Sequence, residues 1–205
     1  MTGTYGDFRR LLTTRFRDVL SHGTHEANSK ACALEARNAA LGLDWSDSPG
    51  DYLDLRSLND GPWRSDQART EALLPVLRAT WDWPSWSPER QQRWAAAVAL
   101  RTVKEVLPVA LRACGLEAEA AASEQAPTLA AAFAAMSAVS TALSARSAEA
   151  WSVAWSARSA ANAMGAVSAA RSAVSTALSA RSAARSAEST EVLSLACRIW
   201  TEGAV

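Results

Sequence analysis

A sequence of twelve residues that occurs twice is the feature that most constrains the fold of this chain. SAVSTALSARSA runs from Ser137 to Ala148 and returns without a change from Ser172 to Ala183, 35 residues further on. Thirty-five residues correspond to five heptads, or about ten turns at 3.5 residues per turn. An internal repeat of this kind predicts that the last third of the chain is long, regular, alanine-rich helix.

The predicted helical module, residues 125–205, is rich in alanine and serine, and its larger apolar residues keep a similar helical spacing. A period near 3.5 favours helices that wind around each other. Small side chains let the backbones approach closely, but each contact buries little apolar area, so the helix needs length or partners for stability. We therefore predict Ala142 and its repeat equivalent Ala177 as interaction residues.

Two tryptophans interrupt the small-residue pattern in the middle of this module. Trp151 and Trp155 lie one helical turn apart, on the face where another serine would be expected. Bulky rings in such a stripe predict anchors, either on the N-terminal region or on a partner protein. Gly165 is the one plausible break in the module. It favours a helical hairpin over a single unbroken helix or coiled coil, although the sequence permits both.

Residues 1–124 carry the signals of a compact N-terminal helical domain. Asp7 is the expected cap of the first helix, and Gly42 the expected end of the second. Ser65 and the pair Ser87–Pro88 begin two further helices. Apolar periodicity predicts helices over about residues 8–20, 29–41, 66–80 and 88–107, with Pro108 as an interruption. Together with the alanine-rich module, these helices predict an all-α fold.

Residues 43–64 break the helical pattern, and Pro–Gly and Gly–Pro pairs within them indicate turns, so residues 44–66 are the candidate ligand segment. A long irregular stretch in a compact domain is often functional. Trp45 and Trp63 offer aromatic surface there, and Asp47 and Asp60 offer acid groups. We predict that the two aspartates cap or tie the loop and that any ligand site lies beside these four residues. The ordinary alternative is that they only make turns and packing contacts.

The sequence carries no motif that specifies a metal site or a catalytic centre. His22, His25 and Cys32 could supply three zinc ligands, but no fourth ligand is evident. Oxygen-rich side chains in residues 44–66 suit calcium or magnesium, but their spacing is not that of an EF-hand. The sequence has no phosphate loop and ties neither histidine to a nucleophile. We expect no cofactor, no metal and no enzymatic activity.

The composition of the chain limits the classes of partner and the cellular compartment that we expect for it. The chain has 21 basic and 21 acidic residues, so no overall charge attracts it to nucleic acid or to a membrane surface. No apolar run is long enough to span a bilayer, and the first residues lack the apolar core of a signal peptide. Three cysteines far apart do not make a disulfide framework, which indicates a reducing compartment. We expect a cytoplasmic protein.

Several short stretches carry a resemblance to a protein family. They are Cys32–Glu35, Trp45–Pro49, Leu58–Trp63, Arg69, Leu73–Val76 and Leu195–Trp200. The chain resembles a group of uncharacterised bacterial and phage proteins that join an N-terminal helical region to an alanine-rich tail. Some alanine-rich relatives look like toxin-immunity proteins. The resemblance covers most of the chain and implies no catalytic residue.

These observations favour a non-enzymatic protein that acts in protein–protein interaction or scaffolding, as a homo-oligomer or with a protein partner. The first alternative is a toxin-neutralising or other inhibitory binding protein of a phage or bacterium. The second is a metal- or ligand-binding enzyme that uses residues 44–66. A scaffold predicts self-association through the tail, and an inhibitor predicts a monomer with one tight partner. An enzyme predicts a bound metal or ligand near Asp47 and Asp60.

Overall fold

The computed structural model describes residues 3–27, 30–113, 116–128, 130, 131, 134 and 187–204. Within these ranges the chain forms helices and no strand, which confirms the all-α prediction. The repeat copies, the proposed break at Gly165 and the predicted interaction residues Trp151, Trp155, Ala142 and Ala177 lie outside the described residues. The hypotheses that rest on them stay predictions.

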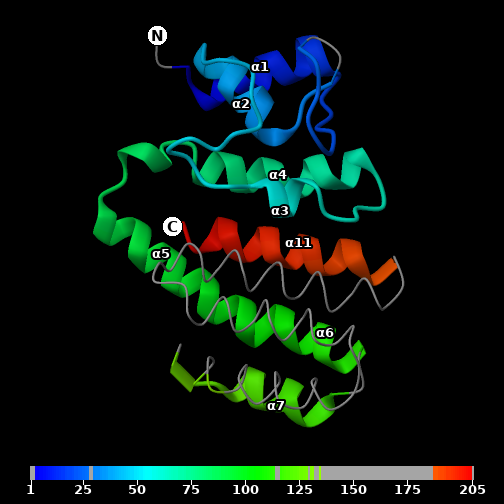
Figure 1. Ribbon diagram of the computed structural model, residues 1–205, viewed down its shortest axis with the longest axis vertical. Helices are drawn as coiled ribbons and strands as arrows, with labels where there is room; N and C mark the ends of the chain where they lie inside the picture. Colours follow the sequence, from blue (N-terminus) through cyan, green and yellow to red (C-terminus); the bar gives the residue numbers. More distant parts are fainter. Residues whose placement is uncertain are drawn as a thin grey trace.

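The described helices are stacked in layers (Figure 1). They are α1 (Tyr5–Phe16), α2 (Ala33–Leu41), α3 (Arg56–Asn59), α4 (Asp66–Ala79), α5 (Pro88–Arg101), α6 (Leu107–Ala113), α7 (Glu117–Gln125) and α11 (Ala187–Glu202). Helices α1 and α2 lie at one end of the long axis, and α4 with α3 comes next. Helix α11 follows, then α5 with α6, and α7 lies at the far end.

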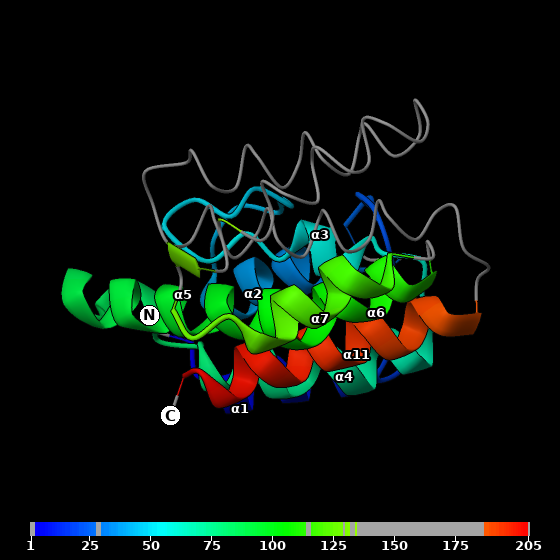
Figure 2. The ribbon, with the colours of Figure 1, turned by 90° about the horizontal axis from the view of Figure 1, so that it is seen from below.

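Helix α11 is the last element in the sequence, yet it lies in the middle of the stack, alongside α4 (Figures 1 and 2). Its large apolar residues Leu193, Ile199 and Trp200 are buried in the same core as residues of α1 and α4. Gly61 approaches this helix so closely that a Cβ added there would lie 2.8 Å from the methyl groups of Leu193. Helix α11 therefore completes the core of the N-terminal helices.

The sequence pattern predicts residues 187–202 as part of the alanine-rich module of residues 125–205. The structure shows that these residues pack with the N-terminal helices instead. The physical reason is composition: the side chains of Leu193, Ile199 and Trp200 have far more apolar area to bury than those of alanine and serine. The boundary predicted between residues 124 and 125 stays a prediction.

The first helix begins and ends differently from the expectation. Thr4, not Asp7, is the N-cap, and Asp7 takes the third helical position of a capping box. The Thr4 hydroxyl accepts a hydrogen bond from the Asp7 amide at 3.1 Å, and the Asp7 carboxylate accepts one from the Thr4 amide at 2.8 Å. The helix ends at Phe16 because Arg17 adopts a left-handed conformation. Leu20 is buried beyond the end of the helix.

Other helix boundaries follow local signals. Gly42 ends α2 in a left-handed conformation, and Ser65 and Ser87 cap α4 and α5, as predicted. Pro108 does not end its helix, because a π-helical turn at Thr102–Val106 precedes it and the chain continues as α6. Proline cannot donate to the carbonyl one turn back and clashes with it, and a wider turn relieves this conflict.

Candidate functional site

The two aspartates of the predicted ligand loop bind the segment that follows α1. The Asp47 carboxylate accepts a hydrogen bond from the Thr24 hydroxyl at 2.8 Å. The Asp60 carboxylate accepts one from the Gly23 amide at 2.7 Å and one from the Asn59 side chain at 2.7 Å. Both carboxylates thus tie residues 23–24 to the irregular segment. One oxygen of each carboxylate, Oδ2 of Asp47 and Oδ1 of Asp60, thus has a partner within the protein.

The two tryptophans of the same segment have separate surroundings. Trp45 is half-buried, its indole N–H donates to the His25 carbonyl at 2.6 Å, and its ring packs on Phe16 with centroids 5.9 Å apart. Trp63 is buried, and its indole N–H donates to the Leu58 carbonyl at 2.7 Å. Indole groups with a buried ring and a satisfied N–H are typical packing elements.

A buried carboxylate, Glu35, organises the segment that contains the candidate zinc ligands. It accepts hydrogen bonds from the backbone amides of His25 at 2.7 Å and Cys32 at 2.8 Å. The Nδ1 atom of His25 lies 2.9 Å from the same carboxylate. Burial raises the pKa of the Cys32 thiol to about 12, which keeps it protonated and weakens it as a ligand or nucleophile. Within the described residues, no group of three or more His, Cys, Asp or Glu residues is arranged around a metal position.

Residues that carried the family resemblance meet around the buried side chain of Asn59. Its carbonyl oxygen accepts from the Ala33 amide at 3.1 Å, and its amide group donates to the Ser21 carbonyl at 3.0 Å. Nε of Arg69 donates to the Asn59 backbone carbonyl at 2.6 Å, and its Nη1 contacts Asp66. The arrangement joins segments that are far apart in the sequence, and its polar atoms are used in that joining.

Sequence reasoning missed Glu35 and Asn59 as the centres of these polar contacts. For Glu35 a signal existed, because the spacing Cys32-x-x-Glu35 matches a capping box with cysteine in place of serine or threonine. The structure shows that Cys32 is the N-cap of α2 and that its sulfur accepts from the Glu35 amide at 3.4 Å. For Asn59 no local signal existed, since its partners come from other segments.

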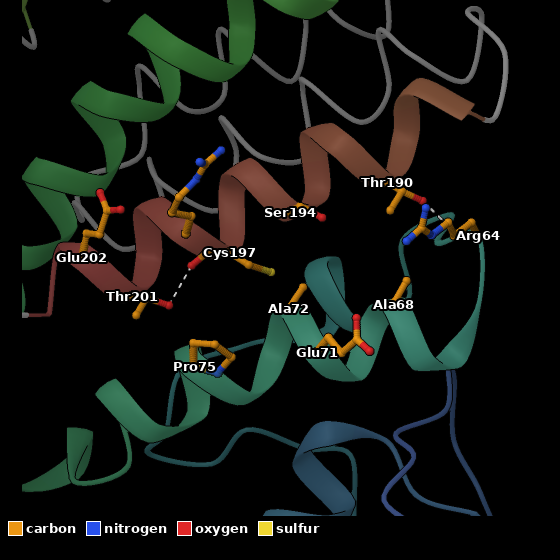
Figure 3. Close-up of a pocket in the computed structure, with 11 residues that line it drawn as sticks. Arg64, Ala68, Glu71, Ala72, Pro75, Thr190, Ser194, Cys197, Thr201 and Glu202 are labelled. Atoms are coloured by element: carbon orange, nitrogen blue, oxygen red, sulfur yellow. Dashed lines mark hydrogen bonds between the residues drawn. The ribbon is translucent and has the colours of Figure 1, made fainter.

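A groove of about 380 Å³ lies between α4 and α11 (Figure 3). Its walls are mainly small side chains: Ala68, Ala72 and Pro75 of α4, and Thr190, Ser194, Cys197 and Thr201 of α11. Figure 3 shows these residues facing one another from the two helices. Small residues recurring on facing helices leave space that larger side chains would fill, and this explains why the groove exists.

Charged residues stand at the rim of this groove, and some have partners. The Glu202 carboxylate accepts a hydrogen bond from Arg101 at 2.5 Å, and the hydrogen bonds of Arg101 to Glu105 and, second, to Glu202 raise the pKa of Arg101. Cys197 lines the groove but is buried, and burial raises the pKa of its thiol. The groove can hold a small apolar or neutral polar group. A thiol held protonated does not make it a nucleophilic site.

Comparison with known proteins finds no matching family model, no matching curated protein and no matching solved structure. The resemblance drawn from the sequence therefore stays an expectation. In the part of the chain that the structure describes, no helix combines the length and apolar character needed to cross a membrane.

Proposed function

We propose that this protein is a non-enzymatic interaction protein that binds another protein chain through its alanine-rich module. The observation that carries the proposal is the position of α11 in the core of the N-terminal helices. Residues 135–186, which hold both copies of the repeat, lie in the sequence between α7 and this core helix. The segment is thus joined at both ends to one packed body. This lowers the conformational entropy that the segment would lose on binding a partner.

Asp47 and Asp60 in residues 44–66, and the buried Glu35, are acid groups that an enzyme at this site could use. Their hydrogen bonds support a structural role instead. Asp47 and Asp60 accept hydrogen bonds from Thr24 and Gly23, and Glu35 accepts them from His25 and Cys32. Carboxylates that hold backbone and hydroxyl groups in place serve the packing of loops. This favours the interaction hypothesis over a metal- or ligand-binding enzyme.

The partner is either a second copy of the chain or a different protein, and the two cases differ in the mass measured in solution. A scaffold that assembles with itself gives a mass above that of one chain, which is 21.8 kDa, and the mass rises with concentration. An inhibitory binding protein stays at the mass of one chain and captures one partner from a lysate. Light scattering after size exclusion, followed by a pull-down with mass spectrometry, distinguishes the two.

The variants Ala142→Leu and Ala177→Leu test the predicted contact face. A leucine at either position would block the close approach of backbones that a small-residue face allows. We expect each variant to lose self-association or partner capture while the described body still unfolds cooperatively. Arg181→Gln is the matched control in the same module and should behave like the natural protein. Unchanged mass and unchanged capture for both leucine variants would overturn the proposal.

A further inference from the structure

A second cavity, of about 460 Å³, lies where the chain leaves α1 and passes the first residue of α4. Three cationic side chains line it, from Arg15, Arg17 and Lys30. One carboxylate, Asp66, lines it as well. Phe16 and Val19 add apolar wall, so the cavity combines a hydrophobic surface with an excess of positive charge. We refer to this cavity as the basic cleft.

Ion pairs between described residues do not neutralise the positive charge of the basic cleft. Among the described residues, no carboxylate pairs with Arg15, Arg17 or Lys30, and all three side chains are exposed. The Asp66 carboxylate is already engaged by Arg69. Three cations that face one cavity attract an anion, because their fields add where the low-dielectric wall excludes water.

Aromatic rings hold one of these cations beside the cleft. The Arg15 guanidinium lies over the rings of Phe16 and Trp45, at 5.4 and 5.7 Å from their centroids. Stacking of this kind restricts the arginine side chain while its N–H groups stay available as donors. Trp45, which the sequence placed beside a ligand loop, thus lies next to the cleft through Arg15.

Ser21 supplies a polar group within the cleft. Its residue is only 4% exposed, and its backbone is fixed by a hydrogen bond from its amide to the Ala31 carbonyl at 2.8 Å and by the contact with Asn59. Its hydroxyl makes no hydrogen bond with any described residue, although the residue lines the cavity. A nearly buried hydroxyl without a protein partner is a ready donor to a ligand.

The backbone at the entrance is unusual. Arg17 and Asp18 are consecutive non-glycine residues with left-handed conformations, at φ 55° and φ 60°. Asp18 is held there by the Thr13 hydroxyl, which donates to its carboxylate at 2.7 Å. Glycine would adopt the conformation of Arg17 at lower cost. Arginine at this position instead brings a guanidinium to the cleft.

We propose that the basic cleft binds the phosphate group of a small phosphorylated molecule. Ser21 donates a hydrogen bond to a phosphate oxygen, and Arg15, Arg17 and Lys30 neutralise its charge. Arginine donors suit phosphate geometry, and the volume of the cleft leaves room for a small organic group beside the phosphate. The cleft brings together only three cations, and the chain is neutral overall, which favours a small molecule over a nucleic acid strand.

The test uses the full chain labelled with ¹⁵N, titrated with inorganic phosphate and with pyrophosphate at constant ionic strength. We expect saturable shifts of the Ser21 and Lys30 amide signals, and no such shifts with sodium chloride. Arg17→Gly keeps the left-handed backbone and removes the guanidinium, so it should fold and should weaken binding by about tenfold or more. Ser21→Ala and Lys30→Gln should each weaken binding as well.

Arg10→Gln is the matched control, because it removes an exposed arginine from α1 that does not line the cleft. It should leave the affinity for pyrophosphate unchanged. Equal losses in Arg10→Gln and Arg17→Gly would show attraction by net charge alone and would overturn the proposal. The proposal would also be overturned if neither phosphate nor pyrophosphate bound saturably. The same holds if a single-stranded RNA oligomer bound at a concentration of phosphate groups at which inorganic phosphate and pyrophosphate do not bind.

Discussion

At the scale of single residues, buried polar side chains hold the connections between helices in place. Glu35 accepts hydrogen bonds from the backbone amides of His25 and Cys32 ahead of α2, and Asn59 accepts one from the amide of Ala33, the first residue of α2. Arg69 adds donors to the Leu20 and Asn59 carbonyls. Each buried polar group without a partner would cost about 1–3 kcal/mol, so these contacts decide where the loops lie.

Cys32 gives a prediction about pH. Its thiol has an ordinary pKa of 9.0, and burial raises this to about 12 in the folded protein. Between these values the unfolded chain loses the proton while the folded protein keeps it. Stability that is fully present below pH 9 therefore falls as the pH rises towards 12, by about 1.4 kcal/mol per pH unit from this group.

The variant Cys32→Ser removes this titration and keeps the cap, because a serine hydroxyl can accept from the Glu35 amide as the sulfur does. We expect the variant to be at least as stable as the natural protein at pH 7. The difference in free energy of unfolding between the variant and the natural protein should be about 2 kcal/mol larger at pH 10.5 than at pH 7, in favour of the variant. Guanidinium unfolding at both pH values measures the difference. An equal loss of stability in the two proteins would contradict the assigned role of burial.

At the scale of elements, α11 gives the sharpest prediction. Trp200 is 1% exposed and packs edge-on against Trp94, with ring centroids 5.2 Å apart, and the Trp94 indole donates to its carbonyl at 3.1 Å. We expect Trp200→Ala to lower the free energy of unfolding by about 3–5 kcal/mol. Arg198→Ala, on the exposed face of the same helix, should change it by about 0.5 kcal/mol or less. Thermal or chemical unfolding compares the two, and similar losses would mean that α11 is not a core helix.

Local signals in the sequence predicted several helix boundaries well. Ser65, Ser87 and Gly42 act through their own side chains or backbone conformations, so their roles can be derived from neighbouring residues alone. The end of α1 could not be predicted in this way. Arg17 is left-handed without being glycine, and apolar residues continue beyond it to Leu20.

The position of α11 could not be predicted from local pattern either. Its sequence adjoins the repeat, and the period of a helix does not specify which helix it packs against. The same limit applies to the candidate site. Trp45, Asp47, Asp60 and Trp63 were found from composition, but their partners come from other segments of the chain. The basic cleft likewise joins residues of three segments, none of which carries a recognisable motif.

At the scale of the whole molecule, helices from both ends of the described chain pack together. The first helices and the last one share one core, and α5, α6 and α7 continue the stack on the other side of α11 (Figure 1). A body closed in this way buries the large apolar residues of both ends of the described chain. We therefore expect this body to hold its fold when the repeat is removed.

This expectation can be tested by replacing residues 135–186 with a Gly/Ser linker of about 30 residues, whose root-mean-square span is about 30 Å. The described core residues from α1 to α7 and α11 are all kept, so the variant should show a cooperative thermal transition and burial of its tryptophans. Self-association or partner capture should be lost with the repeat. A second variant that ends at residue 186 lacks α11, and it should expose the core and bind a hydrophobic dye. If instead the linker variant unfolds as readily as the truncated one, the repeat is part of the folding core, and a separate interaction module does not describe this protein.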